Sequence, residues 1–205
     1  MFNWFIEKIS DLNFANISPN DILIAHTKIA ECFASDIRVC LSFYEKTDND
    51  KYSIMLELSE WENDTNNIQF EDFEKWDHWQ FLDFFIKKRN LIPSNKNINT
   101  LCNNYETIAS NLSPDDRFQL LVQTEMNYHA IFDKILKAHD RDTLGYDFFL
   151  YYVKKHEEFD LEDGGHSDLL KKYFDVDNII VSSIREERIK LFKSLEVLDK
   201  NLSVS

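Results

Sequence analysis

Glycine and proline are scarce in this chain, with three of each among 205 residues. Glycine adopts positive φ angles without strain and proline favours turns, so a chain this poor in both offers few places for tight turns. A β-sandwich needs such turns between most of its strands, whereas long helices need them only at their ends. The composition therefore predicts an all-α fold, and 43% apolar residues suffice for one helical domain over residues 1–205.

The chain carries a formal net charge of -14, from 37 acidic and 23 basic residues. Nucleic-acid phosphates and anionic lipids are bound mainly through Lys and Arg, so this balance argues against both as partners. The first ten residues contain neither a basic segment nor an apolar run long enough for a signal peptide or a membrane span. We expect a cytoplasmic protein that acts on a small-molecule substrate and binds no nucleic acid and no membrane, with a homodimer left open.

Three cysteines are present, Cys32, Cys40 and Cys102. Their number is odd and none of them forms a CxxC pair, so neither a disulfide framework nor a zinc ribbon is indicated. We expect buried, reduced thiols.

Hydrophobic periodicity is clearest after residue 68. It predicts helices over 68–88, 114–139, 143–163 and 178–202. The second of these has the best start signal, because Ser113 is a natural N-cap and Pro114 suits the first helical position.

Residues 37–59 fit two patterns. Their apolar side chains recur at helical spacing, and they also alternate around Thr47-Asp-Asn-Asp50 as in a small β-hairpin. We favour helices and keep the hairpin as the alternative.

Ionisable residues interrupt the apolar stripes of three predicted helices. Glu125 and His129 stand where apolar side chains are expected on the helix over 114–139. Glu71 and His78 are seven residues apart, which places them two turns apart on one face of the helix over 68–88. Both helices therefore direct carboxylate and imidazole groups toward the interior of a bundle.

The third of these helices carries His156 and Asp160 one turn apart, followed by Asp163 and His166. Burying unpaired charges costs several kcal/mol, so three such helices would not converge without a compensating cation. Imidazole and carboxylate without thiolate suit iron or manganese, and about six inward ligands suit two bridged ions. The pattern therefore predicts a metal centre.

The order Glu71-x6-His78, a lone Glu125, and His156-x3-Asp160 with His166 beyond resembles the haem-oxygenase-like di-iron oxidases and oxygenases. This resemblance covers about residues 68 to 200. It implies a bundle of seven or eight helices similar to haem oxygenase, with two Fe(II) ions, O2 and an external reductant. Such enzymes include alkene-forming fatty-acid decarboxylases and N-oxygenases.

Carried over to this sequence, the resemblance makes all six residues metal ligands, with Glu125 as the bridging carboxylate and the catalytic residue. The sequence departs from the family at the end of the motif. Members close with a His two residues after their Asp, whereas five residues separate Asp160 from His166. Asp163, with two residues before His166, is therefore the substitute for Asp160, and one iron in place of two stays open.

The expected function is an O2-activating, iron-dependent oxidoreductase acting on an amino acid, a fatty acid or an aromatic amine. One alternative is a metal-free helical module that processes a cofactor, like thiaminase, for which Cys102 would be the nucleophile to consider. Another is a protein-interaction module using exposed aromatic residues such as Trp4 and Phe5. His26 and His139 are expected to be structural or surface residues.

Overall fold

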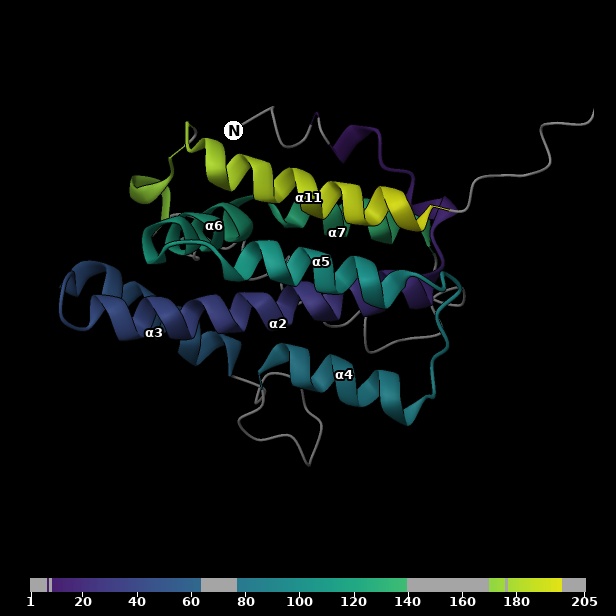
Figure 1. Ribbon diagram of the computed structural model, residues 1–205, viewed down its shortest axis with the longest axis horizontal. Helices are drawn as coiled ribbons and strands as arrows, with labels where there is room; N and C mark the ends of the chain where they lie inside the picture. Colours follow the sequence, from purple (N-terminus) through teal and green to yellow (C-terminus); the bar gives the residue numbers. More distant parts are fainter. Residues whose placement is uncertain (1–6, 8, 64–76, 140–169, 176, 197–205) are drawn as a thin grey trace, which may run out of the picture.

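The structure is a computed structural model that describes residues 7, 9–63, 77–139, 170–175 and 177–196 (Figure 1). Within these ranges it contains seven α-helices, two short 3-10 helices and no strand, so the all-α prediction is confirmed. In chain order they are η1 (Phe14–Asn16), α2 (Pro19–Tyr44), α3 (Asn49–Glu62), α4 (His78–Lys88), α5 (Ile98–Ser110), α6 (Pro114–Asn127), α7 (His129–Ala138), η3 (Lys171–Tyr173) and α11 (Ile179–Leu195).

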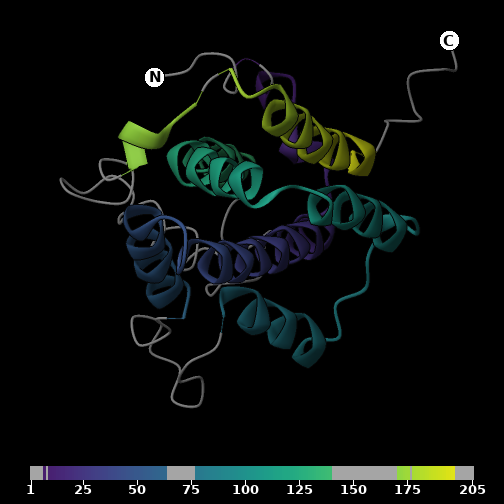
Figure 2. The same ribbon diagram turned by 60° about the vertical axis from the view of Figure 1, so that its left-hand side comes forward.

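Helix α2 is the centre of the bundle. It contacts α3, α4, α5, α6 and α11, and Figure 2 shows α4 on one side of it, with α6 and α5 on the other. The core has two apolar clusters along α2. The larger surrounds its first half with side chains of α4, α5, α7 and α11, and the smaller surrounds its second half with side chains of α3 and α6.

Helices over 37–59, the favoured prediction, are confirmed, and the β-hairpin alternative is wrong. Residues 37–44 belong to α2 and residues 49–59 to α3, so the predicted turn around Thr47 joins two helices. On the helices Ile37, Cys40 and Tyr44 share a buried face at i, i+3 and i+7, which strand alternation would have divided between two faces.

The predicted helix over 68–88 is not continuous, which corrects the sequence-based prediction. Its described part starts only at His78, because Asp77 has extended backbone angles (φ -59°, ψ 146°) and ends any helix before it. The Asp77 amide donates to Gln80 Oε1 (3.0 Å), half of a capping box. Glu71 lies outside the described residues.

The other predicted helices have mixed outcomes. The helix over 114–139 is observed as α6 and α7, which meet at Tyr128 without a loop because that residue keeps helical angles. The predicted cap is confirmed: Pro114 is the first helical residue and the Ser113 hydroxyl accepts from the Asp116 amide (3.2 Å). Helix α11 ends at Leu195, before the predicted residue 202. The predicted helix over 143–163 lies outside the described residues.

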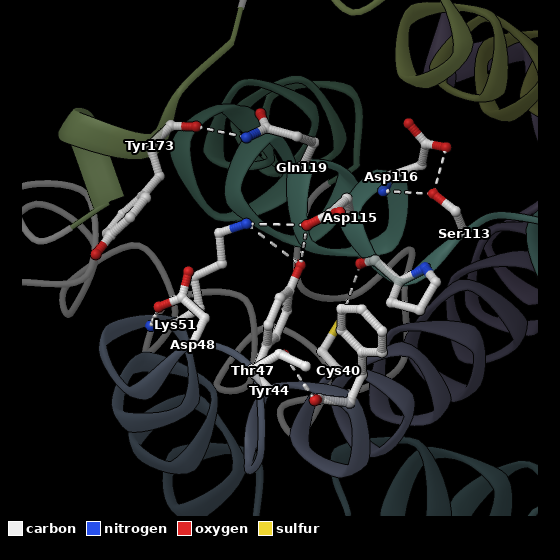
Figure 3. Close-up of polar contacts among 12 residues, drawn as sticks. Cys40, Tyr44, Thr47, Asp48, Lys51, Ser113, Asp115, Asp116, Gln119 and Tyr173 are labelled. Atoms are coloured by element: carbon white, nitrogen blue, oxygen red, sulfur yellow. Dashed lines mark hydrogen bonds and ion pairs between the residues drawn. The ribbon is translucent and has the colours of Figure 1, made fainter.

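The start of α6 is bound to the α2–α3 pair by a cluster of polar contacts. Figure 3 shows the Tyr44 hydroxyl donating to Asp115 Oδ1 (2.6 Å), with Lys51 Nζ at 2.9 Å from the same oxygen. The thiol of Cys40 donates to the Pro114 carbonyl in the same cluster (3.5 Å). These contacts fix the axial position of α6 relative to α2.

A buried ion pair lies next to that cluster. Its acidic member, Asp36, is one turn of α2 before Cys40 and two turns before Tyr44. Arg117 of α6 binds Asp36 of α2, and its guanidinium also donates to the carbonyls of Leu112 (3.0 Å) and Ser110 at the end of α5. Burial raises the pKa of Asp36 to about 6, although the positive charge of the adjacent Arg117 acts in the opposite direction. One arginine therefore connects α2, α5 and α6.

Replacing Asp36 by alanine leaves the buried Arg117 without its counter-charge. We expect Asp36→Ala to lower the free energy of unfolding by about 3 to 5 kcal/mol at pH 8, measured by urea denaturation. Asp36→Asn keeps an acceptor oxygen and should cost less. Asp133→Ala, which removes the exposed Lys137 pair, should cost under about 1 kcal/mol. Equal losses for Asp36→Ala and Asp133→Ala would contradict this role.

Candidate functional site

His78 is the first residue of α4 and is buried, with 3% of its surface exposed. Its Nδ1 lies 3.2 Å from Oε2 of Glu62, the last residue of α3, which is also buried. Oε1 of Glu62 is buried as well and accepts no hydrogen bond from the described part of the chain. The ends of two helices thus bring a carboxylate and an imidazole together in the interior.

The electrostatic surroundings of His78 are acidic. Burial opposes protonation of the imidazole, but the adjacent Glu62 carboxylate outweighs it, and Glu125 and Asp77 add to the effect, so the pKa of His78 is raised. Glu125 lies on α6, half-buried, close enough for its charge to act on His78. The structure therefore brings two of the predicted ligands, His78 and Glu125, into one electrostatic neighbourhood.

The remaining predicted ligands, Glu71, His156, Asp160 and His166, lie outside the described residues, as does Asp163, the substitute. Within the ranges that are described, no three His, Cys, Asp or Glu side chains form a group able to hold a metal ion. The described chain thus supplies part of the predicted set.

Sequence reasoning missed Glu62. Its signal was present, because Ile54 and Leu58 are buried at i and i+4 and Glu62 is the next residue of that series. A carboxylate in line with a buried apolar stripe is carried into the interior by the same helix. The ambiguity between helix and hairpin over 37–59 hid that stripe.

A buried polar network lies beside this pair. His26 of α2 has its Nδ1 3.0 Å from the Tyr128 hydroxyl. Arg188 of α11, 2% exposed, lies with its guanidinium carbon 5.2 Å from the centre of the Tyr128 ring and donates to the Tyr105 hydroxyl (3.0 and 3.3 Å). Arg188 also donates to the Thr124 hydroxyl (3.3 Å). Buried arginines on α11 are the second feature that sequence reasoning missed.

His26 stays neutral in this network. Burial lowers its pKa to about 3, and the nearby charges of Arg188 and His78 act in the same direction. His139 is also buried, with Nε2 2.8 Å from the Phe14 carbonyl oxygen. Both histidines are bound to neutral groups of the fold, as the structural reading predicted. His129 is half-buried on α7.

The three cysteines are free and buried, as predicted. Burial raises the pKa of Cys102 to about 11 and that of Cys32 and Cys40 to about 12. A thiol acts as a nucleophile through its thiolate, which is scarce at neutral pH when the pKa is this high.

No family model, no curated protein and no solved structure matches this chain. The resemblance to di-iron oxidases therefore depends on the sequence motifs alone. Among the helices of the described residues, none is long and apolar enough to span a membrane.

The lowered pKa of His26 predicts acid sensitivity. The unfolded chain takes up a proton on this residue near pH 6.5, whereas the folded protein does so only near pH 3. Stability contributed by neutral His26 is therefore lost as the pH falls below 6.5, by about 1.4 kcal/mol per pH unit. His26→Gln should remove this part of the slope of unfolding free energy between pH 6.5 and 5.

A matched variant distinguishes the effect of burying the His26 ring from the effect of its hydrogen bond to Tyr128. Tyr128→Phe removes the hydroxyl 3.0 Å from His26 but leaves the imidazole buried, so the acid slope should persist. An unchanged slope in His26→Gln, measured by urea denaturation at each pH, would refute the assignment.

Proposed function

We propose that this protein is a non-haem di-iron oxidase or oxygenase that uses O2 to oxidise a small organic molecule. The observation that carries the proposal is the buried His78–Glu62 pair with Glu125 close enough to act on it. Two of these three residues stand in the motif that resembles the di-iron oxidases, and all three lie on different helices. Metal sites inside helical bundles typically draw their ligands from several helices, and these three residues would need further ligands from outside the described ranges to complete one.

The chemistry of these donors fits iron. An imidazole with carboxylates and no thiolate suits iron or manganese, and among the described residues no cysteine forms a metal-binding group with His78 and Glu62. Leaving a buried acceptor unsatisfied costs about 1 to 3 kcal/mol. Glu62 Oε1 is such an acceptor within the described ranges, and a cation nearby would remove that cost.

The residues that would hold iron are His78 and Glu125, completed by Glu71, His156, Asp160 or Asp163, and His166 as the resemblance implies. When bound, the iron would supply the electrons and the Lewis acidity that O2 needs in order to react.

The chain's own contribution begins with Glu62. Its Oε2 faces His78 Nδ1 at 3.2 Å, which leaves Nε2 of that imidazole as the ligand atom. A carboxylate in this position orients a ligating imidazole and increases its basicity. Glu125 acts on the charge of His78 from α6, and a carboxylate in that neighbourhood is suited to hold a metal or to accept a proton.

Iron binding tests the proposal directly. After anaerobic addition of Fe(II) and removal of unbound iron, the full chain should retain about two iron ions. His78→Ala and Glu125→Ala should each lose at least about half of that metal, because each removes a ligand donor. Exposure of the loaded wild type to O2 should give a visible absorption band in stopped flow.

His139→Gln is the matched control, since His139 is a buried histidine bound to a backbone carbonyl. It should retain iron like the wild type, and circular dichroism should show that all variants stay helical. A wild-type chain that retains no iron after anaerobic loading would refute the proposal and favour a metal-free module. In that case the high pKa of Cys102 would still argue against thiaminase-like nucleophilic chemistry.

A further inference from the structure

The residue immediately before the candidate ligand His78 is held by two side chains. Oδ2 of Asp77 lies 2.7 Å from Nη1 of Arg38 on α2, and it also accepts from the indole Nε1 of Trp79 at 3.0 Å. The Asp77 amide donates to Gln80 Oε1 at 3.0 Å. The backbone at the start of α4 is therefore connected to α2 through one carboxylate.

Apolar packing alone does not determine where His78 lies along α2. Phe81 and Leu82 of α4 belong to the larger core cluster, and they hold that helix against α2. Burial of apolar surface is non-directional, so it tolerates a small slide or rotation of one helix over another. The ion pair is directional, because a charge-assisted hydrogen bond requires a particular distance and angle. Arg38 thus fixes the axial position of the residue that precedes the imidazole.

The two members of this ion pair differ in their access to solvent. The Asp77 side chain is 12% exposed, whereas that of Arg38 is 56% exposed. The protein therefore shields the acidic member, while the basic member is in contact with water and dissolved ions. Salt weakens ion pairs that have an exposed member, since counter-ions screen the exposed charge. Salt therefore acts on Asp77 from the surface of the protein, through Arg38.

We propose that the Arg38–Asp77 pair controls how firmly the candidate site retains its metal ion. Both residues act through His78, so they are positioning residues and not ligands. The intact pair keeps the imidazole beside Glu62, 3.2 Å from its carboxylate, with the other ring nitrogen left for the metal. Loss of the pair gives the start of α4 more freedom, and His78 then leaves the metal more often. The identity of the metal rests on the proposed function, whereas the ion pair is a feature of the chain itself.

The ion pair is tested first without metal. The indole N–H of Trp79 donates to the Asp77 oxygen that binds Arg38, so its NMR resonance, identified by its loss in Trp79→Phe, reports on that carboxylate. In the full chain, Arg38→Gln should make this proton exchange with water about threefold faster. Arg38→Lys keeps the charge and should restore most of the protection. Lys87→Gln removes the exposed pair with Asp83 on the same helix and should have no effect.

Iron release then tests control of the metal. After anaerobic loading with Fe(II), transfer of iron to an excess of the chelator ferrozine should be about threefold faster from Arg38→Gln than from the wild type. Raising NaCl from about 50 mM to about 500 mM should accelerate release from the wild type and from Lys87→Gln, but hardly from Arg38→Gln. A general loss of stability would not remove this salt dependence, because the dependence belongs to the ion pair.

The outcomes separate this proposal from the proposed function. A wild type that retains no iron would refute the proposed function itself. If iron is retained, equal release rates in Arg38→Gln and the wild type, or equal acceleration of both by salt, would overturn control by Arg38. An unchanged exchange rate of the Trp79 indole proton in Arg38→Gln would overturn it without any use of iron.

Discussion

Helix α2 is surrounded by other helices, and this constraint decides where its neighbours can lie. A helix enclosed on most sides must bury some of its polar side chains, and each of these needs a partner. Asp21 accepts from the amides of Ser94 and Asn95 (2.8 and 3.0 Å) ahead of α5, and Asp36 binds Arg117 of α6. Because each partner comes from a different segment, the polar residues of α2 set the register of its neighbours.

The candidate site inherits its geometry from the same helix. Arg38 of α2 binds Asp77 at 2.7 Å, and Asp77 is the N-cap residue immediately before α4. Because Asp77 is held in this way, the next residue, His78, lies at the C-terminal end of α3, in contact with Glu62. A surface arginine on the central helix thus determines the position of the imidazole, although neither Arg38 nor Asp77 belongs to the predicted ligands.

Sequence reasoning succeeded where a local signal and the tertiary fold agree. The Ser113 cap and the buried cysteines follow from residue chemistry that packing does not change. It was weaker where local patterns compete. Apolar alternation over 37–59 imitated a hairpin, although helices were favoured there and are observed, and the helical pattern over 68–88 hid the break at Asp77, although Asp77 and Gln80 have capping-box spacing. The competing hairpin drew attention away from Glu62, which only a helix places on the same face as Leu58.

The buried polar groups differ in how completely the fold satisfies them. Arg188 is a full charge in the interior, yet each of its three nitrogens donates to a hydroxyl oxygen, of Tyr105 or of Thr124, and an aromatic ring covers its guanidinium. Such a network holds α11 against α5 and α6 and needs nothing further. Glu62 is different, because one of its oxygens faces His78 while the other accepts from no described residue. A fold that satisfies Arg188 so fully has no structural reason to leave that carboxylate half-satisfied, so the function of this protein is most reasonably sought where Glu62 and His78 meet.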